Sequence, residues 1–94
     1  MTYRLAIDPA ARKEWTRLDK SVKTRFKAKL SERLENPRVA GAALSGSPDL
    51  YKIKITTPQF RLAYHVDDAH KRLTILAVTS RDDVYAVLAN RLKK

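Results

Sequence analysis

Two neighbouring segments with strict alternation of side-chain type, residues 50–56 and 60–66, constrain the fold of this chain more than any other feature. Successive side chains of a β-strand point to opposite faces, so every second residue shares a face. One predicted face is apolar and suits a core; its members are Tyr51, Ile53, Ile55, Leu62, Tyr64 and Val66. The opposite face carries Lys52, Lys54 and Arg61, which a hairpin would bring side by side. The pattern therefore predicts a sheet with one apolar face and one cationic face.

The segments on either side of this hairpin predict the strands that complete the sheet. Alternating side chains over residues 2–7 indicate a short first strand, and residues 72–79 have the composition of a last strand. The connections between the three later strands are short enough for an antiparallel meander. Residues 38–49 contain both glycines and are typical of a loop rather than of a linker between domains.

Helical periodicity predicts two helices between the first strand and that loop. Asp8 and Pro9 suit the start of the first helix, because the carboxylate can accept from a free amide of the first turn. Asp19 is expected to cap the second helix in the same way, and Pro37 follows its end. The apolar stripe of the two helices consists of Ala11, Trp15, Leu18, Val22, Phe26, Leu30 and Leu34. This stripe should pack on the sheet, and a last helix is expected from about Asp82.

The size and composition of the chain fit one globular domain. It has 94 residues, of which 44% are hydrophobic and 32% charged. We expect residues 1–94 to form a single small α+β domain of order β-α-α-β-β-β-α, with a mainly antiparallel four-stranded sheet packed on a helical hairpin and a short C-terminal helix. Cysteine is absent, which excludes disulfides and thiolate nucleophiles, and the sequence lacks a signal peptide or an apolar run of about 20 residues. A cytoplasmic protein without membrane association is therefore expected.

The charge balance points to a class of partner. The formal net charge is +10, and such a charge is typical of proteins that bind a polyanion or an acidic partner. Nucleic acid is the leading candidate, although a ribosomal protein or a basic binding module would have a similar charge. The two histidines lack metal-ligand spacing and no glycine-rich phosphate loop is present, so we expect no metal and no cofactor.

Each candidate functional residue also has a structural interpretation. Lysine alternating with isoleucine is ordinary in a solvent-facing edge strand. Arg61 could pair with Asp67 or Asp68 across a turn. Arg81 could pair with Asp83 or cap an element, and Tyr85 could be a packing residue of its helix. His65 shares the face of Arg61 and could act as an acid or base, but a solvated histidine is commoner.

Four stretches carry a resemblance to a known family: Ala11–Trp15, Leu34–Arg38, Leu44–Lys54 and Phe60–Tyr64. On these stretches the chain resembles, nearly end to end, the RelE toxins of bacterial and archaeal toxin–antitoxin pairs, within the wider RelE/ParE superfamily. The loop and strand motifs also occur in gyrase-poisoning members, so they identify the fold. The paired lysines, together with Arg81 and Tyr85, favour the ribonuclease branch.

The resemblance implies an endoribonuclease that enters the A site of the 30S ribosomal subunit and cuts the mRNA codon there. It also implies an acidic antitoxin, which would neutralise the toxin and through which operator DNA would be bound. The segment between Arg81 and Tyr85 is shorter than in the family pattern and holds two aspartates. The site positions that the resemblance implies are Lys52, Lys54, Arg61, Arg81 and Tyr85.

RNA cleavage without a metal needs a deprotonated 2′-hydroxyl, a stabilised phosphorane and a protonated leaving oxygen. Neighbouring positive charges disfavour the protonated form of Lys54, so we expect it to be the general base. Lys52 and Arg61 would hold the nonbridging oxygens, Arg81 would stabilise the transition state and help protonate the leaving group, and Tyr85 would stack on a base. The products would be a 2′,3′-cyclic phosphate and a 5′-hydroxyl. A gyrase-inhibiting toxin without enzymatic activity and a noncatalytic RNA-binding protein remain the alternatives.

Overall fold

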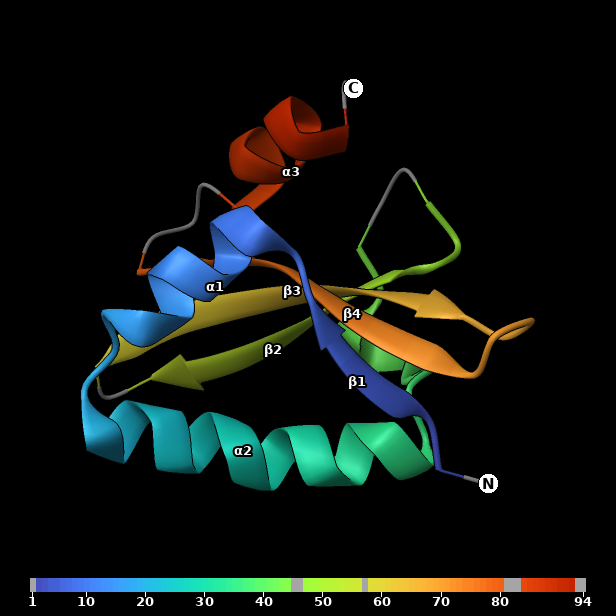
Figure 1. Cartoon of the computed structure of the whole chain (residues 1–94), viewed down its shortest axis with the longest axis horizontal. Coiled ribbons are helices and arrows are strands. Elements are labelled where there is room, and N and C mark those ends of the chain that lie inside the picture. Colours follow the sequence, from blue (N-terminus) through green and yellow to red (C-terminus); the bar gives the residue numbers. More distant parts are fainter. Residues whose placement is uncertain (1, 45–46, 57, 81–83, 93–94) are drawn as a thin grey trace.

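A four-stranded sheet between helices forms the framework of the protein. The computed structural model describes residues 2–44, 47–56, 58–80 and 84–92. The elements in chain order are β1 (Arg4–Ile7), α1 (Pro9–Thr16), α2 (Lys20–Glu35), the 3₁₀ turn η1 (Ala40–Ala42), β2 (Leu50–Thr56), β3 (Gln59–Asp67), β4 (Arg72–Thr79) and α3 (Val84–Leu92). Figure 1 shows α2 running beneath the sheet and α3 lying above it, with α1 rising from the start of α2 toward β4.

The spatial order of the strands is β1-β4-β3-β2. β1 is parallel to β4, whereas β4, β3 and β2 form an antiparallel meander. The expected α+β fold with a mainly antiparallel sheet is therefore confirmed. None of the helices in the described part of the chain combines the length and apolar character that crossing a bilayer requires.

The register of β2 and β3 separates their side chains as the alternation predicts. Ile53 lies opposite Leu62, and Lys54 lies opposite Arg61. The first pair belongs to the main core, which α2 covers with Val22, Phe26 and Leu30. Burying a side chain of this size contributes roughly 1.5–3 kcal/mol, so this face supplies most of the stability of the fold.

A second, smaller cluster lies on the opposite face. α3 covers Ala63 of β3 and Ala77 of β4 with Val84 and Leu88. Alanine is small, so the helix can approach the strands closely. β2 lies farther across the sheet than β3 and β4. α3 therefore covers one part of this face, and the lysines of β2 lie beside the covered part.

The first two helices begin after the predicted aspartates, but only one of these aspartates makes a side-chain capping bond. The Asp8 carboxylate accepts from the Ala10 amide at 3.1 Å, and Pro9 begins α1, as predicted. Asp19 stands at the N-cap position of α2, but its side chain makes no capping hydrogen bond. The predicted N-cap position of Asp19 is therefore confirmed, without a side-chain bond.

Asp67 at the end of β3 and Asp68 in the turn after it have partners other than Arg61. Asp68 pairs with Arg38, and Asp67 pairs with His70 and more loosely with Arg72. Arg61 lies six residues from Asp67 along the same strand, a distance of about 20 Å. The interpretation of Arg61 as a partner of these aspartates is therefore wrong.

Candidate functional site

Three of the five predicted site residues lie on one face of the sheet, and two of them share a row across it. Lys54 of β2 is the register partner of Arg61 of β3, which in turn is the register partner of Thr79 of β4. Neighbouring strands lie about 4.8 Å apart, so the first two side chains start from adjacent backbone positions. Lys52 precedes Lys54 by two residues and shares its face. The structure thus brings Lys52, Lys54 and Arg61 together as the sequence predicts.

These three cations differ in exposure. Lys54 is exposed, Lys52 is half-buried and Arg61 is only 6% exposed. An exposed lysine side chain can adopt several conformations, whereas a buried guanidinium is held in one orientation. The row therefore offers one accessible amine beside a fixed cation, which suits the recognition of a negatively charged oxygen.

Hydrogen bonds from the far face of the sheet hold the backbone of β2 at this point. Arg33 of α2 donates to the Lys52 carbonyl at 3.1 Å and to the Tyr64 hydroxyl at 2.9 Å. The Tyr64 hydroxyl donates in turn to the Pro37 carbonyl at 2.7 Å. Burial raises the pKa of Tyr64, and the hydrogen bond from Arg33 opposes that shift. This chain of bonds keeps the strand that carries the lysines in place.

Arg81 and the side chain of Tyr85 lie outside the described structure. Arg81 follows Ser80 in the sequence, which directly follows the end of β4. The backbone of Tyr85 belongs to the first turn of α3. Their assignment to the site therefore stays a prediction.

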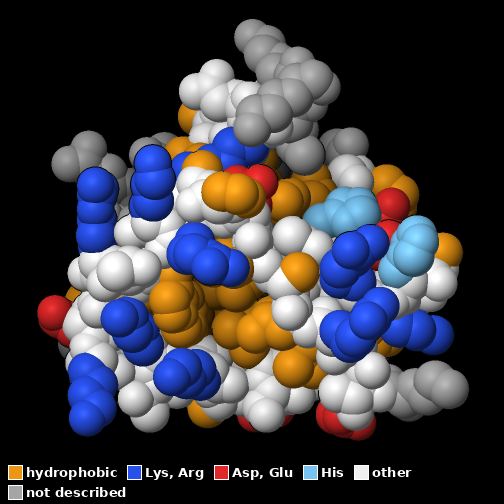
Figure 2. Space-filling model, in the orientation of Figure 1, with side chains coloured by type: hydrophobic (Ala, Val, Ile, Leu, Met, Phe, Trp, Pro, Cys, Tyr) orange, Lys and Arg blue, Asp and Glu red, His pale blue; other side chains and the backbone are white. Residues whose placement is uncertain are grey.

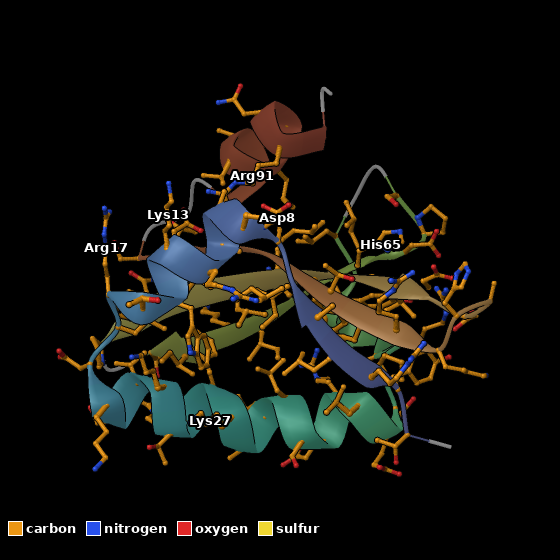
Figure 3. All side chains as sticks on the ribbon, viewed as in Figure 1. Asp8, Lys13, Arg17, Lys27, His65 and Arg91 are labelled. Atoms are coloured by element: carbon orange, nitrogen blue, oxygen red, sulfur yellow. The ribbon has the colours of Figure 1, made fainter. Side chains whose placement is uncertain are left out.

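A hollow of about 330 Å³ lies where β4 ends between α1 and α3. Thr79 lines it from the end of β4, Val87 lines it from α3, and Ser80 and Arg17 line it from the positions just after β4 and α1. Figure 3 shows Lys13 of α1 and Arg17 extending on the same side of the molecule. A role for Arg17 was not predictable from the sequence, because most of its neighbours in this hollow are distant along the chain. Their arrangement makes Arg17 an additional cation close to the end of the row.

The histidines stand apart from the row. His65 is half-buried and pairs in register with Leu50 and Thr74, and Ala63 beneath α3 separates it from Arg61. Figure 3 places it across the molecule from Arg17. The His70 ring lies 2.8 Å from the Asp67 carboxylate. Within the described ranges, no three His, Cys, Asp or Glu side chains form a group that could hold a metal ion.

A second hollow, of about 360 Å³, opens between β1, α1 and α2. It is lined by apolar side chains that include Trp15 and Leu5, and Leu5 is 50% exposed. Arg12 and Lys27 also line it. In Figure 2 hydrophobic side chains gather in the middle of this face, and Lys and Arg side chains lie around them. The surface combines apolar area with positive charge, which suits an amphipathic acidic partner.

Comparisons with known proteins extend over nearly the whole chain. The family described as "ParE toxin of type II toxin-antitoxin system, parDE" matches residues 5–85. The mRNA interferase toxin RelE of Escherichia coli (strain K12) is 38% identical over 94 residues, covering 98% of this chain and 99% of the relative. A free E. coli RelE variant with two arginines replaced by alanine has a TM-score of 0.89 at 36% identity, covering 99% of this chain and 97% of that one. A chain of the intact E. coli RelBE toxin–antitoxin complex has a TM-score of 0.82 at 39% identity, covering 85% and 98%.

Proposed function

Because this chain belongs to the RelE family of toxins of type II toxin–antitoxin systems, within the RelE/ParE superfamily, we propose that it is a ribosome-dependent mRNA endoribonuclease. Residues 1–94 would act as one domain in the cytoplasm, cutting mRNA in the A site of the 30S subunit and thereby stopping translation. The observation that carries the proposal is the pairing of exposed Lys54 with buried Arg61 on the face opposite the core. This pairing places two cations where one phosphate can meet both.

In the proposed reaction Lys54, in its neutral form, accepts the proton of the ribose 2′-hydroxyl. The 2′-oxygen then forms a bond to the phosphorus, and the bond from phosphorus to the 5′-oxygen breaks. Lys52 and Arg61 hold the nonbridging oxygens, while Arg81 stabilises the developing charge and helps protonate the leaving oxygen. Tyr85 stacks on a base of the codon. The fragments carry a 2′,3′-cyclic phosphate and a 5′-hydroxyl, and the reaction needs no metal ion.

Dependence on the ribosome follows from the small number of groups in this site. The row has too few cations to bind and read a flexible RNA strand by itself. A ribosome that holds mRNA near the attack geometry can lower the activation free energy by roughly 7–11 kcal/mol, as good intramolecular orientation does. Free RNA should therefore be cut far more slowly than mRNA in the A site.

A gyrase-inhibiting toxin of the same fold is the second candidate function. It is favoured by one observation, the ParE description of the matching family. The 38% identity to an mRNA interferase over 98% of this chain favours the nuclease. Inhibition through protein contact also has no need for a row of cations aimed at one phosphate. We therefore place the nuclease first.

The partner that we propose for the free toxin is an acidic antitoxin. A net charge of +10 favours a partner of opposite charge, and the related E. coli toxin occurs in a complex with its antitoxin. The apolar hollow with Arg12 and Lys27 would receive an amphipathic segment of this partner. Operator DNA would be bound through the antitoxin.

The proposed function can be tested with purified protein and ribosomes programmed with a defined mRNA. Primer extension would locate the mRNA ends for the native protein, for Arg81→Ala and for a reaction without ribosomes. Cuts within the A-site codon that disappear in both comparisons are the expected result. Intact mRNA on programmed ribosomes, together with inhibited gyrase supercoiling, would overturn the proposal in favour of the second candidate. Equal cutting of free RNA at the same positions would overturn the dependence on the ribosome.

A further inference from the structure

Glu14 of α1 and Arg91 of α3 close the exposed edge of β4. β1 pairs with β4 over Arg72–Ile75, so the end of β4 extends beyond this pairing. There the Val78 amide donates to Glu14 Oε1 at 2.9 Å, and the Leu76 carbonyl accepts from Arg91 Nη1 at 2.6 Å. Backbone groups at a sheet edge need partners when they are shielded from water. The two side chains therefore act on this edge as a neighbouring strand would.

The two side chains also bind each other through a pair of hydrogen bonds. Arg91 Nη1 lies 2.9 Å from Glu14 Oε1, and Nη2 lies 2.8 Å from Oε2. The side chains are only 19% and 27% exposed, and the hydrogen bond to Glu14 raises the pKa of Arg91. Figure 3 shows Arg91 reaching from α3 toward α1. A paired contact of this kind fixes direction as well as distance.

α3 is thus attached to the sheet in two different ways. Near its start, Val84 and Leu88 are buried against the alanines of β3 and β4. Apolar burial is not directional, so it fixes the rotation of a helix less closely than hydrogen bonds do. Arg91, close to the other end of α3, adds hydrogen bonds that fix the rotation more closely. Tyr85 follows Val84 in the first turn, so a rotation of α3 would carry it around the helix axis.

We infer that Glu14 and Arg91 are a positioning pair that fixes the orientation of α3, and with it the backbone position of Tyr85, relative to the row of Lys54 and Arg61. This inference rests on the proposed cleavage of mRNA. The pair acts on the orientation of the helix rather than on the substrate. It therefore controls how fast bound mRNA is cut and leaves the affinity for the ribosome unchanged.

Conservative variants separate this role from a general loss of charge. Glu14→Gln keeps the size and one acceptor oxygen, and Arg91→Lys keeps the charge but loses the two-bond geometry. Lys13→Gln is the matched control, because this exposed neighbour of Glu14 also changes the net charge by one unit. We expect the single-turnover cleavage rate at saturating ribosomes to fall roughly 10- to 100-fold in the first two variants and not in the control. The apparent affinity for ribosomes should stay within about twofold in all three.

Two further measurements complete the test. In the double variant Glu14→Gln/Arg91→Lys the rate should equal that of the slower single variant, because the two residues act as one unit. Hydrogen exchange of the α3 amides should be faster than in the native protein, while exchange in β2 and β3 stays slow and shows that the variants are folded. Native cleavage rates in both single variants, equal losses of rate and affinity, or unchanged exchange in α3 would each overturn the inference. If native protein leaves ribosomal mRNA intact, the proposed function fails instead, and the exchange measurement still decides whether the pair fixes α3.

Discussion

The face of the sheet that meets α2 and the face that carries the cations are made from alternate residues of the same strands. On the first, Ile53 and Leu62 are at most 1% exposed, and Phe26 of α2 belongs to the same core cluster. On the second, the strands present alanines to α3, and beside them Lys54 and Arg61 stand next to each other. The first face provides stability and the second is free to carry the proposed chemistry. Substitutions on the two faces should therefore have different consequences.

The largest effect should come from the cationic face. Lys54→Ala removes the proposed general base and is expected to slow single-turnover cleavage roughly 10²- to 10⁴-fold. Because Lys54 is exposed, its loss should leave the melting temperature nearly unchanged. The measurement is the cleavage rate on programmed ribosomes together with a thermal melt. Lys29→Ala, at an exposed position of α2, is the control and should cut at the native rate. A native cleavage rate in Lys54→Ala would contradict the assignment of the chemistry to the cationic face.

The apolar face should give the opposite result. Phe26→Ala leaves a cavity in the main core and is expected to lower the free energy of unfolding by about 3–5 kcal/mol. The cleavage rate per folded molecule should remain close to native, because the row across β2 and β3 is unchanged. Denaturant unfolding and cleavage, corrected for the folded fraction, would measure both quantities. Phe26→Leu, a milder change, provides a folded companion if Phe26→Ala does not fold.

A smaller effect is expected at Tyr64, a core residue that is connected through Arg33 to the backbone of Lys52. Tyr64→Phe removes the hydroxyl that donates to the Pro37 carbonyl and accepts from Arg33, which also donates to the Lys52 carbonyl. Unsatisfied buried partners cost about 1–3 kcal/mol, so the free energy of unfolding should fall by that amount. The cleavage rate should change less than the stability does. A large loss of rate in a folded Tyr64→Phe protein would mean that the faces are tightly coupled.

The smallest effect should lie outside both faces, in the β3–β4 turn. The hydrogen bond with the His70 side chain, aided by the His70 amide, lowers the pKa of Asp67 below its ordinary value. A lowered carboxyl pKa stabilises the folded state above the unfolded pKa, about 3.9, and this contribution disappears as the pH falls through the folded value. In Asp67→Asn the difference in melting temperature between pH 7 and pH 3 should therefore narrow, by roughly 1–3 °C. An unchanged difference would show that this contact does not contribute.

The sequence predicted the features that depend on short spacing. Alternation placed Lys54 beside Arg61 because a strand has a period of two residues, and Asp8 was recognisable as a cap because its partner is two residues away. Asp19 likewise occupies the predicted N-cap position, but its side chain makes no capping bond. Local pattern therefore predicted positions more reliably than individual side-chain bonds.

Features that depend on distant segments were not predictable in this way. The contact between Glu14 and Arg91 joins residues 77 positions apart, and nothing in the neighbourhood of either indicates the other. The parallel pairing of β1 with β4 and the irregularity between Ala63 and Tyr64 likewise depend on how the whole chain folds. The site that we propose thus combines the row of Lys54 and Arg61, which strand alternation predicts, with α3, which long-range contacts fix in place.

Chemical analysis of the mRNA ends produced on the ribosome tests the central claim most directly. The native protein and Lys54→Ala would be incubated with programmed ribosomes, with the 3′ and 5′ ends of the fragments identified by mass spectrometry. The account predicts a 2′,3′-cyclic phosphate and a 5′-hydroxyl from the native protein, and few or no fragments from Lys54→Ala. Fragments with a 3′-hydroxyl and a 5′-phosphate, or equal cutting by Lys54→Ala, would contradict the proposed attack by the 2′-hydroxyl on the cationic face.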